Sequence, residues 1–470
     1  MQNSNIPSLL LLTANTLLVG CAGTMPVADG ERQWLAGDHH IHSRYSVGYE
    51  PDTSPPVPII GGDAIYPIPM NNLMGHLYGL SWAVATDHGG PNHSKVNYEQ
   101  AYPELLLSRE AIPDMLQFYG MELNTPGADH STVMIAHTHD EREHLHEIES
   151  TYDSREAWPL DPGRNTEARM LEALQLMDGF EAKPIVIANH PSRSARDLRV
   201  YGLDEPAELR GWNDTAPEVA VGMAGAPGHQ AAGLVGAPRG AYGAYPTHGG
   251  FDQMTAIVGG FWDSMLGEGR HWWITANSDS HIHVSEGRVD FWPGEYSKTY
   301  VYAEKSYEDI MDGLRSGRVF VTTGDLVSEM HVEASAGNAS ATIGGELQLA
   351  GPQEVTVDIT VKDPDGPNHH DDNPAVSRID LIVGEIHGTV ADKSVDTNPT
   401  THVARRFTAS NWTRRGEFIN VSHTFLADKP MYLRVRGTST RELEPVQDPS
   451  GEDPWQDLWF YSNPVFISVE

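Results

Sequence analysis

Short apolar runs recur along the first two-thirds of the chain, and a histidine or carboxylate follows closely after most of them. The runs cover residues 81–86, 116–120, 184–188 and 272–276. Runs of this length are typical of strands buried on both faces, as in a parallel sheet. A polar side chain just past each strand then points into one rim, which is where α/β barrels place their chemistry.

Helical patterns alternate with these strands. Residues 165–178 place Met170, Leu171 and Leu174 on or near one helix face. Residues 306–309 resemble a capping box that opens a helix over 307–315. The alternation predicts a mixed α/β fold over residues 33–325, either an α/β barrel or a doubly wound sheet.

The pattern changes from about Val327. Short alternating strands, expected at 355–361, 378–383, 431–436 and 463–469, are separated by Gly, Pro and Asp turns. Such spacing is typical of a β-sandwich, so we predict an all-β sandwich-like domain over residues 326–470. No internal repeat is present in the sequence.

Two segments lack periodicity. Residues 43–73 are rich in Pro and Gly, and residues 222–250 are mostly Gly, Ala and Pro. Long irregular loops in compact domains are often functional, so both are interpreted as walls or lids of a site, with plain surface insertions as the alternative. Tyr242, Tyr245 and Phe251 are candidates for an apolar wall beside a substrate.

Charge narrows the possible partners. The 470 residues carry 65 acidic against 31 basic side chains, a net charge of -34. Nucleic-acid binding needs basic surface to neutralise phosphates, so no nucleic-acid partner is expected. A phosphate substrate would need its positive charge from bound metal and a few arginines.

The single cysteine, Cys21, excludes an intrachain disulfide and ends an apolar stretch that starts at Leu9. Leu18-Val-Gly-Cys21 resembles a bacterial lipoprotein signal, which predicts a signal over 1–21, a linker over 22–32 and an exported, periplasmic or outer-membrane protein. Residues 1–8 carry no Lys or Arg, unlike most signal peptides. An apolar N-terminal strand or a disordered leader is the alternative. Membrane contact is expected only through a lipid on Cys21.

Metal-ligand side chains recur in a fixed order. His40-x-His42 places two imidazoles on one face of a strand, because strand side chains alternate. Asp279-x-His281 repeats that geometry, and the two oxygens of Glu122 suit a bridge between cations. Mixed imidazole and carboxylate ligation favours Zn, Mn or Fe over Ca or Mg.

With these motifs in order, the chain resembles the polymerase-and-histidinol-phosphatase superfamily of metal-dependent phosphoesterases over about residues 33–325. Residues 313–323 look like the closing segment of a branch that includes carbaryl-hydrolase-like proteins. That branch often carries a C-terminal β-domain ending near Tyr-Ser-Asn-Pro, as residues 461–464 do. The resemblance implies a distorted seven-stranded β/α barrel.

The resemblance also implies a ligand set for two or three divalent metals. In the family, a further third-metal ligand often stands at the position of Gly48, which cannot serve here; Glu50, Asp52 or a water are the candidates to replace it, and two metals are the safer count. The implied ligands are His40, His42, Glu122 and Asp279 for a first ion, Glu122, His130 and His190 for a second, and His88 with His281 for a third.

Further polar residues lie near the ligand motifs. Asp38 and Asp87 could orient ligand imidazoles or simply cap turns. Four arginines are candidates for binding phosphate: Arg44, Arg193, Arg196 and Arg288. For each of them, a surface salt bridge is the alternative. A general acid is sought among His229, His248, His271 and His283.

Together these features predict an enzyme that hydrolyses a small-molecule phosphoester, leaning to phosphodiesters or phosphonate monoesters. The expected nucleophile is a metal-bridging hydroxide held at Glu122. The alternatives are a carboxylic or carbamate ester hydrolase on the same metals, a phosphomonoesterase, and a non-catalytic binding protein that uses the β-sandwich.

Overall fold

The computed structural model describes residues 31–470, of which Arg32–Glu470 form one compact unit. The predicted signal with Cys21, and the linker up to residue 30, lie outside the described residues and stay predictions. Within the described part, no helix is both long enough and apolar enough to span a membrane.

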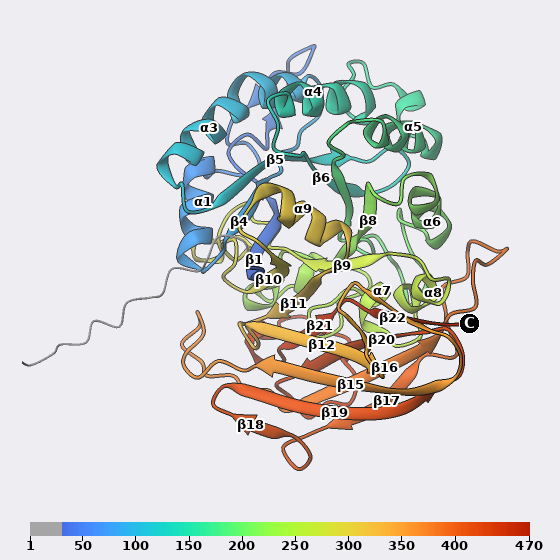
Figure 1. Ribbon diagram of the computed structural model, residues 1–470. Coiled ribbons are helices and arrows are strands. Elements are labelled where there is room, and N and C mark those ends of the chain that lie inside the picture. Colours follow the sequence, from blue (N-terminus) through green and yellow to red (C-terminus); the bar gives the residue numbers. More distant parts are fainter. Residues whose placement is uncertain (1–30) are drawn as a thin grey trace, which may run out of the picture. The chain divides into compact units, whose positions relative to one another are not determined.

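The described unit is a mixed α/β structure with a large mixed sheet and nine α-helices (Figure 1). The helices are α1 (Ile68–Leu77), α2 (His93–Val96), α3 (Tyr102–Ala111), α4 (Glu141–Tyr152), α5 (Glu167–Asp178), α6 (Pro206–Thr215), α7 (Gln253–Ala256), α8 (Phe261–Gly267) and α9 (Tyr307–Arg315). The first eleven strands are β1 (Gln33–Ile41), β2 (Gly48–Tyr49), β3 (Pro58–Ile59), β4 (Trp82–Ala85), β5 (Leu116–Asn124), β6 (His130–Met134), β7 (Ile185–Asn189), β8 (Ala220–Ala226), β9 (Trp273–Ala276), β10 (Ser297–Ala303) and β11 (Val319–Thr323).

Strands β1 and β4 to β9 follow one another in a single path through the large sheet. The four strands expected from apolar runs are present as β4, β5, β7 and β9, and they are almost wholly buried, which confirms that prediction. Parallel pairing joins β1 to β4, β4 to β5, β7 to β8 and β8 to β9. Figure 1 shows α3, α4, α5 and α6 on the outside of these strands.

Strand β6 departs from the expected parallel order. It pairs antiparallel with both β5 and β7. Only residues 125–129 separate β5 from β6. A parallel connection needs a crossover of a dozen or more residues, so this short link permits only a hairpin.

The two ends of this strand path meet beside the ligand motifs. Ile41 forms a parallel bridge with Ser280, and the His42 backbone N–H donates to the Ser280 carbonyl over 3.0 Å. The end of β1 therefore lies next to the segment that follows β9.

Local sequence signals explain the helix positions. The Ser306 side chain accepts a hydrogen bond of 3.1 Å from the Asp309 N–H, and the α9 side chains of Ile310, Met311 and Leu314 are buried. The predicted helix over 307–315 is therefore confirmed. In α5, the Thr166 side chain caps the N-terminus, and of the predicted apolar face Met170 and Leu174 are buried while Leu171 is half-buried.

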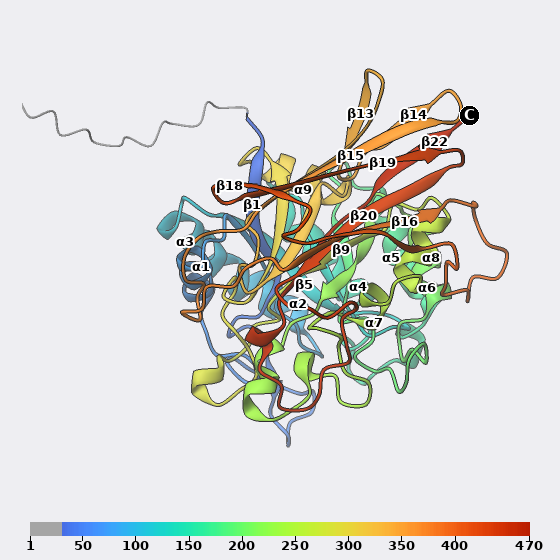
Figure 2. The same ribbon diagram turned by 90° about the horizontal axis from the view of Figure 1, so that it is seen from below.

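The C-terminal residues are all-β apart from one short 3-10 turn, as the sequence predicts, and the four expected strands are present. A five-stranded sheet in the order β13-β12-β15-β19-β18 faces strands that extend the large sheet beyond β11 (Figures 1 and 2). Both sheets contribute to one apolar core. The strands are β12 (Glu329–Ala336), β13 (Ala339–Thr342), β14 (Glu346–Leu349), β15 (Gln353–Lys362), β16 (Arg378–Glu385), β17 (His402–Phe407), β18 (Thr413–Arg415), β19 (Phe418–Ala427), β20 (Met431–Thr438), β21 (Trp459–Ser462) and β22 (Val465–Val469).

Candidate metal centre

A four-residue group lies where β1, β5 and the segment after β9 meet. His40 and His42 at the end of β1 are buried, with their Nε2 atoms 2.9 Å apart. His40 Nε2 lies 3.1 Å from Glu122 Oε1 and 3.2 Å from Asp279 Oδ1. His42 Nε2 lies 3.1 Å from Asp279 Oδ1 and 3.5 Å from Glu122 Oε2. The sequence-predicted first ligand set is thus brought together.

The chemistry of this group fits a cation. Ligand atoms held at about 2 Å from one ion lie roughly 3 Å from one another, as these atoms do. Asp279 Oδ1 is buried and accepts no hydrogen bond within the described residues, which is costly for a carboxylate unless a positive charge faces it. A divalent ion at this position would satisfy both imidazole lone pairs and both carboxylates.

A second group shares Glu122. Its Oε1 lies 3.1 Å from His130 Nδ1 at the start of β6 and 3.2 Å from His190 Nε2 just after β7. Burial alone would raise the pKa of Glu122, but the His130 and His40 imidazoles hold it well below its usual range. Burial lowers the pKa of His190 to about 4, which leaves that ring neutral and able to ligate a metal at neutral pH. Glu122 therefore stands between two sets of nitrogen ligands.

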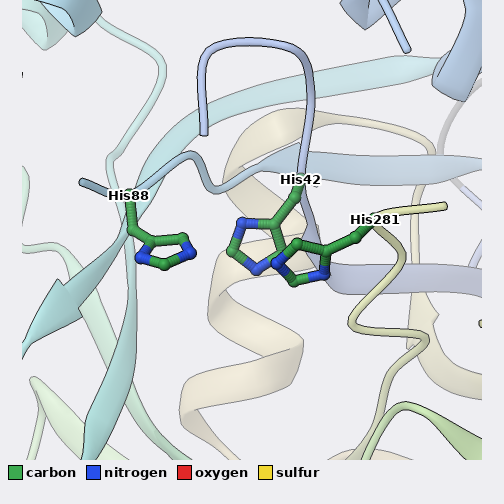
Figure 3. Close-up of side chains that lie close together, drawn as sticks. All are labelled: His42, His88 and His281. Atoms are coloured by element: carbon green, nitrogen blue, oxygen red, sulfur yellow. The ribbon is translucent and has the colours of Figure 1, made fainter. Parts of the chain in front are cut away.

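A third group contains His42, His88 and His281, whose rings approach one another in Figure 3. The His42 and His281 rings stack at 3.8 Å, and the His42 and His88 rings meet edge to face at 4.9 Å. Asp63 completes the group: its Oδ2 lies 2.9 Å from His88 Nε2 and 3.4 Å from His281 Nε2.

Asp63 was not expected at the site from the sequence. Gly48 lies in the short hairpin of β2 and β3, and Gly62 packs closely against it. A Cβ added to Gly62 would come within 2.5 Å of the Gly48 nitrogen. Asp63 follows Gly62 directly, and its carboxylate lies beside His88 and His281. Glu50 and Asp52, the replacements considered from sequence, are exposed and do not line the cavity into which Asp63, His88 and His281 open. The only prior signal was the interpretation of residues 43–73 as a wall of the site.

His229 is the general-acid candidate that lies at the centre. Its Nε2 lies 2.7 Å from Asp279 Oδ2 and its Nδ1 lies 2.5 Å from Asp290 Oδ1. Burial would lower the pKa of His229, but the Asp279 and Asp290 carboxylates raise it well above its usual range. Asp290 also accepts the His281 and Ile282 N–H groups, a role that nothing in the sequence marked. His248, His271 and His283 do not line this cavity.

Asp87 acts on an imidazole through a serine. Ser46 Oγ donates its only proton to Asp87 Oδ1 over 3.0 Å. Ser46 Oγ must therefore accept the hydrogen bond of 2.8 Å that it shares with His42 Nδ1. This fixes the proton of His42 on Nδ1 and leaves the Nε2 lone pair facing the first group. Asp38 instead accepts from the backbone N–H groups of His40 and Ser278, so it holds the two strand ends rather than a ring.

The candidate arginines divide between site and surface. Arg193 and Arg288 line the cavity, and Arg193 Nη2 donates to Asp129 Oδ1 over 2.5 Å. Arg44 is not brought to the site, because its guanidinium pairs with Glu104 on α3 and is 42% exposed. Arg196 does not line the cavity either.

The three groups open into one cavity of about 310 Å³. The irregular segment 43–73 contributes Gly62 and Asp63 to its lining, and the segment 222–250 contributes His229. The expected apolar wall at Tyr242 and Phe251 is wrong: both side chains are buried, at 1% and 0% exposure, and Tyr242 donates to Asp252 over 2.7 Å. Tyr245 does not line the cavity and instead contacts His248.

The side chains of these three groups can therefore hold metal ions. Comparison with known proteins adds no assignment: no protein-family model matches the chain, and no curated protein matches it either.

Proposed function

We propose that residues 33–325 form a metal-dependent hydrolase of phosphoesters, leaning to phosphodiesters or phosphonate monoesters. The observation that carries the proposal is the position of Glu122: its Oε1 lies 3.1 to 3.2 Å from the nitrogens of His40, His130 and His190, and its Oε2 lies 3.5 Å from His42 Nε2. A carboxylate so placed is suited to bridge two metal ions.

The topology supports a finer proposal for the fold. Strands β1 and β4 to β9 form one path whose ends meet at the bridge between Ile41 and Ser280. We infer that these seven strands form a distorted β/α barrel of the polymerase-and-histidinol-phosphatase type. The C-terminal strands then form a β-sandwich against it.

The proposed cofactors are two or three divalent transition metals, Zn, Mn or Fe. When bound, such ions lower the pKa of water and neutralise negative charge on the reacting ester. The chain's own residues supply the geometry: Asp87 and Ser46 fix the tautomer of His42, and Arg193 and Arg288 line the cavity. His229 holds its Nε2 proton toward Asp279 Oδ2.

Charge supports the lean towards a monoanionic substrate. The protein carries a net charge of -34, and Arg193, one of the two arginines lining the cavity, is already paired with Asp129. A dianionic monoester needs more cationic groups than a monoanionic diester. A neutral carboxylic or carbamate ester needs fewer still, so the same observation keeps that hydrolase as the second candidate.

One experiment tests the proposal. We expect purified protein to hold at least two transition-metal ions per chain, and Glu122→Gln to lose metal and activity together because the bridging charge is lost. Metal content is measured by elemental analysis. kcat/KM is measured with an aryl phosphodiester, monoester and carboxylester that share one leaving group, and the diester should be preferred.

The matched control is Glu149→Gln, which removes the negative charge of a buried carboxylate outside the site. Glu149 lies 2.5 Å from His93 Nδ1. The control variant should keep its metal, and circular dichroism should show both variants folded. Full activity in Glu122→Gln or in metal-free protein would overturn the mechanism. A preference of about tenfold for the carboxylester, equivalent to about 1.4 kcal/mol, would promote the second candidate.

A further inference from the structure

A second cavity of about 340 Å³ adjoins the metal centre. Three connections line it: the link between β5 and β6, the link between α4 and α5, and the link between β7 and α6. Sites for small molecules usually enclose at least about 300 Å³, so the cavity is large enough for part of a substrate.

The two cavities meet at His130, which lines both. Asp129 lines the second cavity and Arg193 lines the first, and their ion pair of 2.5 Å joins the two linings. A molecule held in the first cavity next to His130 would thus have the second cavity directly beside it.

The wall of the second cavity is partly apolar. Leu160 and Leu203 line it while 59% and 51% exposed, and Ala128 and Pro162 lie beside them. Large apolar side chains left open to solvent at a cavity are a feature of binding sites. Apart from His130, no histidine lines this cavity, so within the described residues its lining suits an organic group better than a second metal cluster.

We propose that this cavity binds an apolar arm of the ester substrate, the aryl or alkyl group that is not cleaved. The inference rests on the proposed function and deepens it by naming the substrate class: phosphodiesters or phosphonate monoesters with a bulky apolar second group. The apolar wall thus lies at residues 128, 160, 162 and 203 rather than in the segment 222–250.

The test compares two substrates that differ only in that arm. The manganese-loaded protein is assayed with 4-nitrophenyl phenyl phosphate and with 4-nitrophenyl methyl phosphate. The wild type should prefer the phenyl arm. In Leu160→Ser with Leu203→Ser, the ratio of the two kcat/KM values should fall by about tenfold, because a hydrophobic pocket discriminates by that order.

The matched control is Leu198→Ser, which changes an exposed leucine of the β7 to α6 link that does not line the cavity. It should keep the wild-type ratio. Either of two results would overturn the inference. One is an unchanged ratio of the two kcat/KM values in the double variant, as when both values fall equally. The other is the same fall of that ratio in the control.

A binding measurement separates this inference from the proposed function. Calorimetry compares diphenyl phosphate with dimethyl phosphate on the same metal-loaded proteins. If no ester is hydrolysed but the phenyl preference in binding depends on Leu160 and Leu203, the proposed function fails and the cavity assignment stands. If esters are hydrolysed with no arm preference in rate or binding, the reverse holds.

Discussion

Asp63 shows how tertiary packing can bring a carboxylate from an irregular segment to a group of imidazoles. Burial would raise the pKa of Asp63, but hydrogen bonds with His281 and His88 lower it overall, so the carboxylate is charged at neutral pH. A charged carboxylate beside two imidazole nitrogens is a suitable third ligand for a transition metal. Asp63, His88 and His281 thus offer three ligand atoms to the third group, while His42 Nε2 faces Asp279 of the first group.

We therefore predict that Asp63→Ala loses about one metal ion per chain relative to the wild type, because a site with two ligands binds metal weakly. Elemental analysis after dialysis against limiting metal measures the content. Asp52→Ala, in the same irregular segment, should match the wild type. Equal metal content in wild type and Asp63→Ala would show that the third group holds no ion through Asp63.

Helix α9 offers a test of how local sequence sets an element. Its N-terminus depends on the Ser306 side chain, which accepts from the Asp309 N–H. Replacing such a cap by alanine typically costs about 1 kcal/mol of stability. We expect Ser306→Ala to lower the free energy of unfolding by that amount in urea titrations.

The control for this prediction is Ser422→Ala, an exposed serine on β19. It should change the free energy of unfolding by less than about 0.5 kcal/mol. A Ser306→Ala variant as stable as the control would mean that packing under Ile310 and Leu314 alone holds α9.

Elements were predictable where their causes lie within a few residues. The buried run that ends at Asn189, the capping box at Ser306 and the alternation along β15 are all local patterns. Most of the candidate ligands were predictable because they lie in short motifs at or near strand ends, such as His40 and His42 at the end of β1 and His190 just after β7. The hairpin of β5 and β6, the approach of Asp63 and the contact of Asp290 with His229 depend on tertiary packing, which no local pattern records.

At the scale of the whole molecule, the strands that carry the candidate metal centre and the C-terminal strands belong to one sheet. Strand β11 pairs with β10 on one side and with β21 on the other. A buried ion pair adds a second link: Arg434 on β20 donates to both oxygens of Asp263 on α8, over 2.8 and 2.7 Å. Both side chains are fully buried, so each charge depends on the other for its stability.

This arrangement predicts that Arg434→Met lowers the free energy of unfolding by about 3 kcal/mol, because it leaves the Asp263 carboxylate buried without its partner. The additional change Asp263→Asn should recover part of the lost stability, since it removes the unpaired negative charge. The asparagine side chain can still accept the hydrogen bond from the Gly259 N–H. Urea titrations should show one transition, with tryptophan fluorescence and release of bound metal changing at the same midpoint in every variant. Two transitions, with only the one lacking metal release shifted by Arg434→Met, would show instead that the C-terminal strands unfold independently of the metal centre.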